Sequence, residues 1–410
     1  MATPKTPKGK AATIAKPAPK RGAAKPATPS APAKKPSGKV SQRYVIIMAG
    51  GRGERFWPVS REKTPKQLIR LLGERSFLQQ AVDRVLPVVP AENVLIITNA
   101  AQVAEVRRQL PELPKDNIVA EPIGRDTCAA VALGAAIVGA RSEKAVMAVL
   151  PADHVIPEER RFQQVLKDAL DLASRDSVIV TIGIQPTEPA TGYGYIQTGP
   201  VLAAAEGART YKTAFFKAER FVEKPSLEKA TEYLATGQYR WNAGMFVWSY
   251  ATVAAGLAQH QPEISAACER WKKAAAAGAS KLSKVLAAEY PTIQKISIDY
   301  ALLEKATNVV VADGSFAWDD LGAWPALARH VAQDADGNAT VADLVHVDAA
   351  RNIVYDGRTR GRTTITLVGV SDSIVVLTDD AVLVASRAEA QKIKELVRKL
   401  AQSPQHQALV

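Results

Sequence analysis

Basic residues follow a glycine-rich turn near the start of the chain, in a pattern suited to binding a phosphate chain. Gly50, Gly51 and Gly53 come after a short apolar run, and Arg55 and Lys66 follow them. Glycine lets backbone N–H groups approach phosphate oxygens without interference from side chains. The two cations can neutralise the charge of the phosphates. The sequence therefore predicts a nucleoside triphosphate site in this stretch.

Two better-known phosphate loops do not fit these residues. A P-loop needs Gly-Lys followed by Ser or Thr at the start of a helix, whereas Glu54 follows Gly53. A Rossmann fingerprint needs a third glycine where this chain has Phe56. Pro58 and Pro65 also argue against a regular helix here. The remaining alternative is a glycine-rich turn with solvated basic residues.

Carboxylates occur at two turns where a cation site is possible. Asp153 comes directly after a buried apolar run, and Asp319 and Asp320 are adjacent in a later turn. Mg²⁺ prefers oxygen ligands and usually bridges phosphates through one or two carboxylates. Turn and helix-cap aspartates are also very common, and that alternative stays open from the residues alone. His154 is expected to be structural.

A third group of residues could bind a sugar phosphate. Gly192 and its neighbours suit a close backbone approach to a ligand. Glu223 and Asn242 could hydrogen-bond sugar hydroxyls, and Lys224 could pair with a phosphate. Taken singly, each of these is more often a solvated charge or a turn residue.

Several separated motifs, in this order, resemble the sugar-nucleotide pyrophosphorylase family. They are MAGGRGERFWPVS with TPKQ (residues 48–67), EPIGRDT (121–127), LPADHVI (150–156), the motifs around residues 192, 223 and 242, and WDDLG (318–322). The resemblance covers about residues 43 to 402. It implies the transfer of GMP from GTP to α-D-mannose 1-phosphate, with release of pyrophosphate and with Mg²⁺ as the cofactor. Its W-x-D-x-G pattern selects Asp320, rather than Asp319, as the second metal ligand beside Asp153.

The resemblance also implies a role for each remaining candidate. The nucleotide would be bound by Ala49, Gly50, Gly51, Arg52 and Gly53, and its base by Pro122 and Gly124. Arg55 would hold the triphosphate and Lys66 would lie against the reacting phosphates. The sugar phosphate would be bound by Gly192, Glu223, Lys224 and Asn242. Two alternatives remain: the same chemistry on another pair of substrates, and a catalytically silent relative that binds a nucleotide sugar.

Apolar and helical patterns alternate through most of the chain. This predicts an α/β fold with a Rossmann-like, mostly parallel sheet flanked by helices. Ligands of such sheets bind beyond the carboxyl ends of the strands, where the glycine turn and Asp153 lie. The expected strands are 45–48, 94–98, 117–122, 145–150, 178–184 and 309–312. The expected helices are 77–86 (capped by Ser76), a helix ending near 110, 128–140 (capped by Asp126 or Thr127), 158–172 and most of 250–310, including a capped helix at 297–305.

Three regions are expected. Residues 1–42 hold ten Lys or Arg and no Asp or Glu, so the remainder carries only about +2 of the net charge of +12. Such a Lys/Pro/Ala-rich tail should be disordered, with weak contact to polyanions as the alternative to a solvated tail. Residues 43–333 form the catalytic domain. Residues 334–410 form a small β-rich domain with a terminal helix at 387–402, expected to serve packing and homodimer contact. The sequence ends before the isomerase domain that some relatives carry, so a single activity is expected.

Composition excludes several other classes of protein. The chain of 410 residues is 47% hydrophobic, and no apolar run approaches the roughly 20 residues of a membrane span. Cys128 and Cys268 are far apart and the five histidines are scattered, which argues against a disulfide framework or a zinc site. We therefore expect a cytoplasmic protein.

Overall fold

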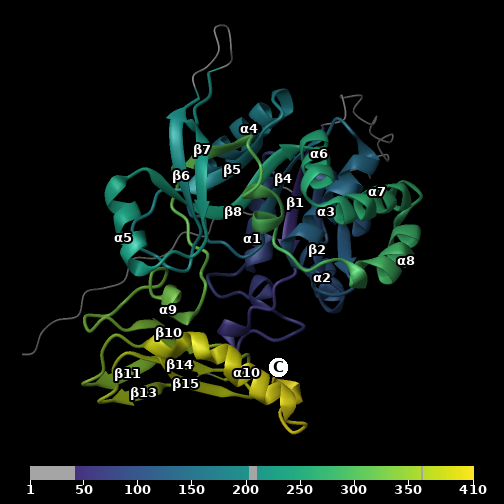
Figure 1. The fold of residues 1–410 in the computed structure, drawn as a ribbon. Coiled ribbons are helices and arrows are strands. Elements are labelled where there is room, and N and C mark those ends of the chain that lie inside the picture. Colours follow the sequence, from purple (N-terminus) through teal and green to yellow (C-terminus); the bar gives the residue numbers. More distant parts are fainter. Residues whose placement is uncertain (1–41, 203–209, 362) are drawn as a thin grey trace, which may run out of the picture. The chain divides into compact units, whose positions relative to one another are not determined.

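The computed structural model describes residues 42–202, 210–361 and 363–410 (Figure 1). The predicted basic tail lies outside these residues, apart from Gln42, and so does its predicted contact with polyanions. None of the helices in the described ranges is long and apolar enough to span a membrane.

The central element is a sheet that has nine strands within the described residues. Its strands are β1 (Arg43–Ala49), β2 (Val94–Asn99), β3 (Ile118–Glu121), β4 (Val146–Pro151), β5 (Ile179–Ile184), β6 (Tyr195–Val201), β7 (Phe215–Val222), β8 (Tyr239–Ser249) and β9 (Val309–Gly314). Their order is β3-β2-β1-β4-β8-β5-β9-β7-β6. The first four strands in this order are parallel, as predicted. However, β8 is antiparallel to β4 and β5, and β7 is antiparallel to β9. The sheet is therefore mixed.

Helices cover both faces of the sheet, because β1 alternates apolar side chains to both sides. Val45 and Ile47 belong to one core with α1 (Phe77–Val85), α2 (Val103–Gln109), α4 (Glu159–Arg175) and α5 (Leu227–Thr236). Ile46 belongs to a second core with α3 (Asp126–Arg141), α6 (Tyr250–His260), α7 (Pro262–Ala276) and α8 (Ala279–Glu289). Figure 1 shows α7 beside α3 and α8 beside α7. The buried strands and amphipathic helices expected from the sequence produce these layers.

The helix starts differ in how well they were predicted. Ser76 caps α1 in a capping box with Gln79, as its sequence pattern indicates. The predicted cap of α3 is wrong, because Asp126 is already helical and Arg125 stands at the N-cap without a side-chain hydrogen bond. The hydroxyl of Thr127 instead accepts a hydrogen bond from the backbone N–H of Ile298 at 2.8 Å.

Two further differences concern the middle of the chain. Strands β6, β7 and β8 and helix α5 form in segments for which the sequence predicts no secondary structure. The predicted helix at 297–305 is a five-residue π-helix, Asp299–Leu303. Single-turn π-helices are frequent at functional sites.

The predicted β-rich C-terminal region is confirmed. It contains β10 (Ala339–Val341), β11 (Leu344–Val347), β12 (Ile353–Asp356), β13 (Ile365–Val368), β14 (Ser373–Leu377) and β15 (Val382–Ser386), after the short helix α9 (Trp324–Leu327). Parallel pairs join β10 to β12, β12 to β14 and β11 to β13. The predicted terminal helix begins as a 3-10 helix at Arg387–Lys392 and continues as α10 (Ile393–Gln402).

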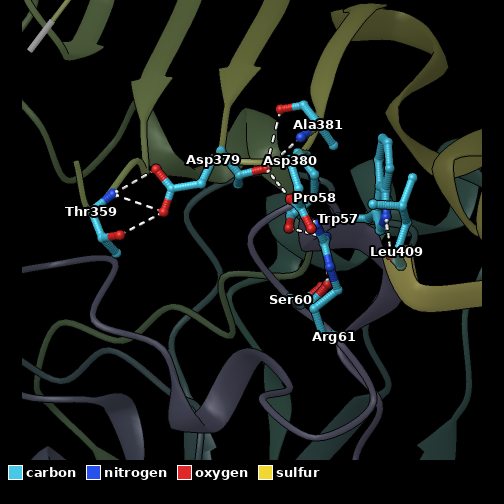
Figure 2. A network of polar contacts seen from close by, with 10 residues as sticks. Trp57, Pro58, Ser60, Arg61, Thr359, Asp379, Asp380, Ala381 and Leu409 are labelled. Carbon is cyan, nitrogen blue, oxygen red and sulfur yellow. Dashed lines mark hydrogen bonds and ion pairs between the residues drawn. The ribbon is translucent and has the colours of Figure 1, made fainter. Parts of the chain in front are cut away.

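The C-terminal region packs on the loop that follows β1. Phe56 and Trp57 share one apolar core with Ile353, Ile374 and Val397. Trp57 Nε1 donates a 2.7 Å hydrogen bond to the carbonyl of Leu409, and Arg61 lies 2.8 Å from the carboxylate of Asp380 (Figure 2). The loop that carries the glycine turn is therefore held between the sheet and the C-terminal elements.

Candidate functional site

The glycine turn after β1 is folded against Lys66. Gly53 has a φ of 61°, and a Cβ at this position would lie 2.6 Å from the Cβ of Lys66. Only glycine adopts this conformation and this approach without strain. The side-chain amide of Gln67 donates to the carbonyls of Ala49 at 2.7 Å and Gly51 at 3.0 Å. The two parts of the predicted phosphate site thus form one unit.

Lys66 is buried and forms an ion pair with Asp153. Its Nζ lies 2.9 Å from Asp153 Oδ2, and it also donates to the backbone carbonyl of Asp320. Only 6% of the Lys66 side chain is exposed, against 36% for Asp153. Burial raises the pKa of the Asp153 carboxyl, but the charge of Lys66 and its hydrogen bond outweigh this effect, so the pKa is lowered overall. Asp153 is therefore a carboxylate at neutral pH.

The two arginines of the turn differ in their surroundings. Arg52 is exposed and pairs with Glu54 at 3.7 Å. Arg55 donates from Nη1 to the carbonyl of Gly322 at 3.3 Å. Its Nε is buried and has no hydrogen-bond partner among the described residues. Because an unpaired buried donor is costly, Arg55 is suited to receive an anionic ligand.

Two adjoining cavities contain most of the predicted site residues. The first has a volume of about 310 Å³ and the second about 220 Å³. His154 and Asp320 line both of them. The predicted residues that line the first are Arg52, Gly53, Arg55, Lys66, Asp153 and Asp320. Those that line the second are Gly192, Glu223, Asn242 and Asp320.

The two adjacent aspartates of the WDDLG turn have different surroundings. Asp320 faces the cavities, and its Oδ1 accepts a 2.9 Å hydrogen bond from the hydroxyl of Tyr193. Asp319 lines neither cavity and is held by Arg329, at 2.7 and 2.9 Å, and by His330 at 2.7 Å. Burial raises the pKa of Asp319, but these hydrogen bonds lower it well below its usual range. The structure thus places Asp320 in the site and Asp319 in its supporting structure.

Polar groups in the second cavity are fixed by one another. Asn242 Nδ2 donates to Asp299 Oδ1 at 2.8 Å, and its Oδ1 accepts the N–H of Gly244 at 3.1 Å. A Cβ on Gly194 would lie 2.6 Å from Glu223 Oε2, so this glycine makes room for the carboxylate. Asp299, in the helix predicted at 297–305, is half-buried, and burial raises the pKa of its carboxyl.

Lys224 does not line either cavity. Its side chain is 64% exposed, and its Nζ lies 2.7 Å from Glu223 Oε1. Lys224 has a φ of 44°, a conformation that non-glycine residues rarely adopt. Observed backbone outliers of this kind concentrate at functional sites. Lys224 therefore stands at the edge of the second cavity through its contact with Glu223.

His154 has a defined and neutral form. The indole N–H of Trp318 donates to His154 Nδ1 at 3.0 Å, which leaves the ring proton on Nε2. Burial lowers the pKa of His154 to about 4, although the charge of Asp153 opposes this. The prediction of a structural histidine did not anticipate its place in the wall of both cavities.

Six predicted site residues line neither cavity: Ala49, Gly50, Gly51, Pro122, Gly124 and Lys224. The predicted base-contacting residues, Pro122 and Gly124, are among them, and Gly124 is exposed. The preceding residue, Glu121, is buried beside the glycine turn: a Cβ on Gly50 would lie 2.8 Å from its Oε2. Burial raises the pKa of Glu121 to about 7, and a hydrogen bond from the Tyr290 hydroxyl, which lowers the pKa, only partly offsets this.

The cavity walls also contain residues that the sequence did not predict for the site, among them Tyr193, Asp299, Trp318 and Lys394. Tyr193 and Trp318 lie within or beside motifs that the sequence singled out, and Asp299 lies in the helix predicted at 297–305. Lys394 lies on α10, far along the chain, and no local signal marks it.

Among the residues that the structure describes, two groups have donor atoms that could hold a metal ion. Asp153 and Asp320 line the same cavity, and each carboxylate has one oxygen outside the hydrogen bonds described above. Asp334, Asp336 and His346 have ligand atoms within 4.8 Å of one another. The carboxylate of Asp334 already accepts backbone N–H bonds from Asp336 and Asn338, which is typical of a turn aspartate.

Comparisons with known proteins agree with this geometry. A family model for nucleotidyl transferases matches residues 44–337, and one for the MannoseP isomerase/GMP-like β-helix domain matches residues 342–400. Mannose-1-phosphate guanylyltransferase of Sinorhizobium fredii (strain NBRC 101917 / NGR234) is 38% identical over 359 residues, which are 87% of this chain and 67% of that protein. The protein of the same name from Escherichia coli (strain K12) is 37% identical over 90% of this chain and 75% of its own.

A solved structure of a relative is also similar to this chain over most of its length. The crystal structure of mannose-1-phosphate geranyltransferase from Thermus thermophilus superimposes with a TM-score of 0.74 at 38% identity, covering 88% of this chain and 99% of that one. The resemblance found in the sequence is thus confirmed by a family model that spans well over half of the chain and by relatives aligned over most of their length. The chain belongs to the nucleotidyl transferase family.

Proposed function

We propose that the protein transfers GMP from GTP to α-D-mannose 1-phosphate, giving GDP-mannose and pyrophosphate. The observation that supports this best is the pair of cavities that adjoin at His154 and Asp320. One has a glycine turn and basic side chains suited to a triphosphate, and the other has fixed polar groups suited to a hexose. The names of the most similar relatives support this choice of substrates.

The reaction joins the contents of the two cavities. An oxygen of the sugar phosphate attacks the α-phosphorus of GTP, and the bond from that phosphorus to pyrophosphate breaks on the opposite side. The protein supplies little covalent chemistry in such a transfer, so positioning and neutralisation of charge provide most of the rate. Both depend on groups held rigidly before the substrates bind.

Each residue in the first cavity has a task in this scheme. Arg55 and the backbone of the glycine turn hold the β- and γ-phosphates. Lys66 lies near the α-phosphate, where negative charge shifts during the reaction. Its burial and its hydrogen bond to Asp153 keep the ammonium in one position, which is what preorganised charge stabilisation requires.

Residues of the second cavity orient the nucleophile. Glu223 and Asn242 hydrogen-bond hydroxyls of the hexose, and Asp299 fixes the amide of Asn242. Lys224, at the edge, pairs with the sugar phosphate and gives up its contact with Glu223 in doing so. The aromatic rings of Tyr193, Trp241 and Trp318, whose centroids lie 5.0 to 6.3 Å apart, support this wall.

Asp153 and Asp320 are the residues that would hold Mg²⁺. Their oxygen donors and their shared cavity fit this ion, which takes one or two carboxylates together with phosphate oxygens. When bound, Mg²⁺ would neutralise charge on the phosphates. Asp153 already faces the buried cation of Lys66, so its carboxylate is ionised and ready to coordinate.

Pyrophosphate release with Mg²⁺ is the test, measured over a grid of four nucleoside triphosphates and several hexose 1-phosphates. We expect release with GTP and mannose 1-phosphate only. Release with another pair would retain the reaction but overturn the assignment of base and sugar. No release with any pair, from folded protein that binds GTP, would favour a silent nucleotide-sugar-binding relative.

A further inference from the structure

The first cavity has a wall that comes from the C-terminal region. Lys394, on α10, lines it together with Arg55, Lys66 and Asp153. Lys394 is half-buried, and its neighbours Ile393 and Val397 are buried in the core shared with Phe56. The lysine therefore projects from a helix face that is anchored on the loop of the glycine turn.

Several hydrogen bonds tie the loop of the glycine turn to the C-terminal region and to Trp324. Trp57 bonds through its indole N–H to the carbonyl of Leu409, and Trp324 Nε1 donates to the carbonyl of Trp57 at 3.0 Å. Figure 2 shows Arg61 reaching Asp380 close to Trp57. The helix that carries Lys394 is held against this loop by the packing of Ile393 and Val397 with Phe56.

Two of the four cations that line the first cavity, Arg55 and Lys394, are available to pair with an anionic ligand. Lys66 is paired with Asp153 and Arg52 with Glu54. Within the described ranges, neither Arg55 nor Lys394 forms an ion pair with a carboxylate. The pKa of Lys394 is lowered by burial and by the nearby charge of Arg55, which Glu54 partly offsets. Two neighbouring cations without carboxylate partners repel each other until an anion binds between them.

We propose that Lys394 binds the β,γ-phosphates of GTP together with Arg55, so that the C-terminal region completes the nucleotide site. The β- and γ-phosphates carry negative charge that can pair with these two cations. Gly53 of the glycine turn, which is suited to a phosphate chain, lines the same cavity. This inference rests on the proposed function for the identity of the nucleotide. It makes the C-terminal β-rich region part of the catalytic machinery rather than a packing element only.

The test compares Lys394→Gln with Lys399→Gln, a lysine on the same helix that is exposed and outside the cavity. Binding of GTP, GDP and GMP is measured by calorimetry without sugar phosphate. Because charge-assisted hydrogen bonds to phosphate are lost, Lys394→Gln should weaken GTP binding roughly tenfold or more, with GMP binding unchanged. Lys399→Gln should bind all three like the unchanged protein, and Lys394→Arg should restore most of the affinity for GTP.

Steady-state kinetics provide the second measurement. In the forward direction, Lys394→Gln should raise KM for GTP and leave KM for mannose 1-phosphate unchanged. In the reverse direction it should raise KM for pyrophosphate and not KM for GDP-mannose. Equal weakening of GTP and GMP, or GTP binding like that of the unchanged protein, would overturn the assignment.

The same data separate this inference from the proposed function. If the unchanged protein shows no turnover but its GTP affinity depends on Lys394, the proposed reaction fails and the phosphate contact stands. If turnover is normal and neither affinity nor KM responds to Lys394→Gln, the reaction stands and the contact fails.

Discussion

Lys66 Nζ lies 2.9 Å from Asp153 Oδ2, although the two residues come from different loops that are 87 positions apart. The pair joins the cation expected near the reacting phosphates to a carboxylate expected to bind Mg²⁺. It forms because the parallel strands β1 and β4 are adjacent, so that the loops after them meet at one edge of the sheet. The fold thereby couples the two groups before any substrate is bound.

Replacing Lys66 by alanine should lower kcat by a factor on the order of 10² or more, because a preorganised charge is removed from the transition state. Steady-state pyrophosphate release measures this. Lys63→Ala is the matched control, since Lys63 is an exposed lysine of the same loop. A kcat near that of the unchanged protein would exclude Lys66 from the reaction.

Gly53→Ala should distort the glycine turn. Its positive φ and the contact with Lys66 leave no room for a methyl group, so we expect a loss of about 1–3 kcal/mol in the free energy of unfolding. Gly51→Ala provides the stability control, because a Cβ there would meet nothing within 4 Å. Urea denaturation compares the two variants. Equal stabilities would show that the turn tolerates the side chain.

The local parts of this site could be predicted from the sequence, because short-range signals determine them. The buried run at Val45–Met48 and the three glycines indicate a strand and a turn without any tertiary information. Asp320 could be separated from Asp319 only by the family pattern. The structure gives a physical reason, because the carboxylate oxygens of Asp319 already form hydrogen bonds with Arg329 and His330.

The conservative variants Asp319→Asn and Asp320→Asn should therefore fail in different ways. Asp319→Asn removes the charge that pairs with Arg329 and His330, and we expect a loss of roughly 2–4 kcal/mol in stability. Asp320→Asn should keep its stability but lower kcat and raise the Mg²⁺ concentration needed for half-maximal activity. Thermal denaturation and a Mg²⁺ titration of both variants test this. Reversed effects would mean that Asp319 is the ligand.

His154 should make stability depend on pH in the acidic range. Its pKa is about 4 in the folded protein and 6.5 in the unfolded chain, so between these values only the unfolded state takes up a proton. Stability therefore falls as the pH drops from 6.5 to 4, by up to about 3 kcal/mol from this group.

Urea denaturation at pH 7.5, 5.5 and 4.5 tests this prediction for His154→Gln. The variant should lose less stability on acidification than the unchanged protein. His260→Gln, on α6, is the control and should not alter the pH dependence. If both variants behave alike, His154 is not the group responsible.

The remaining parts of the site could not be predicted from local sequence, because they depend on long-range packing. Lys394 reaches the cavity only because Val397 and Ile393 pack with Phe56 and Trp57, and no spacing in the sequence relates these segments. The π-helix at Asp299–Leu303 has the same composition as an ordinary helix. The carboxylate of Asp299 contacts Asn242 because β8, which carries Asn242, lies next to the π-helix.

The central claim is that the nucleotide and the sugar phosphate occupy different cavities that adjoin at His154 and Asp320. The most direct test is to measure KM for both substrates in Arg55→Ala and Glu223→Gln, one variant for each cavity. Arg55→Ala should raise KM for GTP roughly ten- to a hundredfold and leave KM for mannose 1-phosphate nearly unchanged. Glu223→Gln should show the opposite pattern. If both variants change the same substrate's KM, or each changes the other's, the division of the site between the two cavities is wrong.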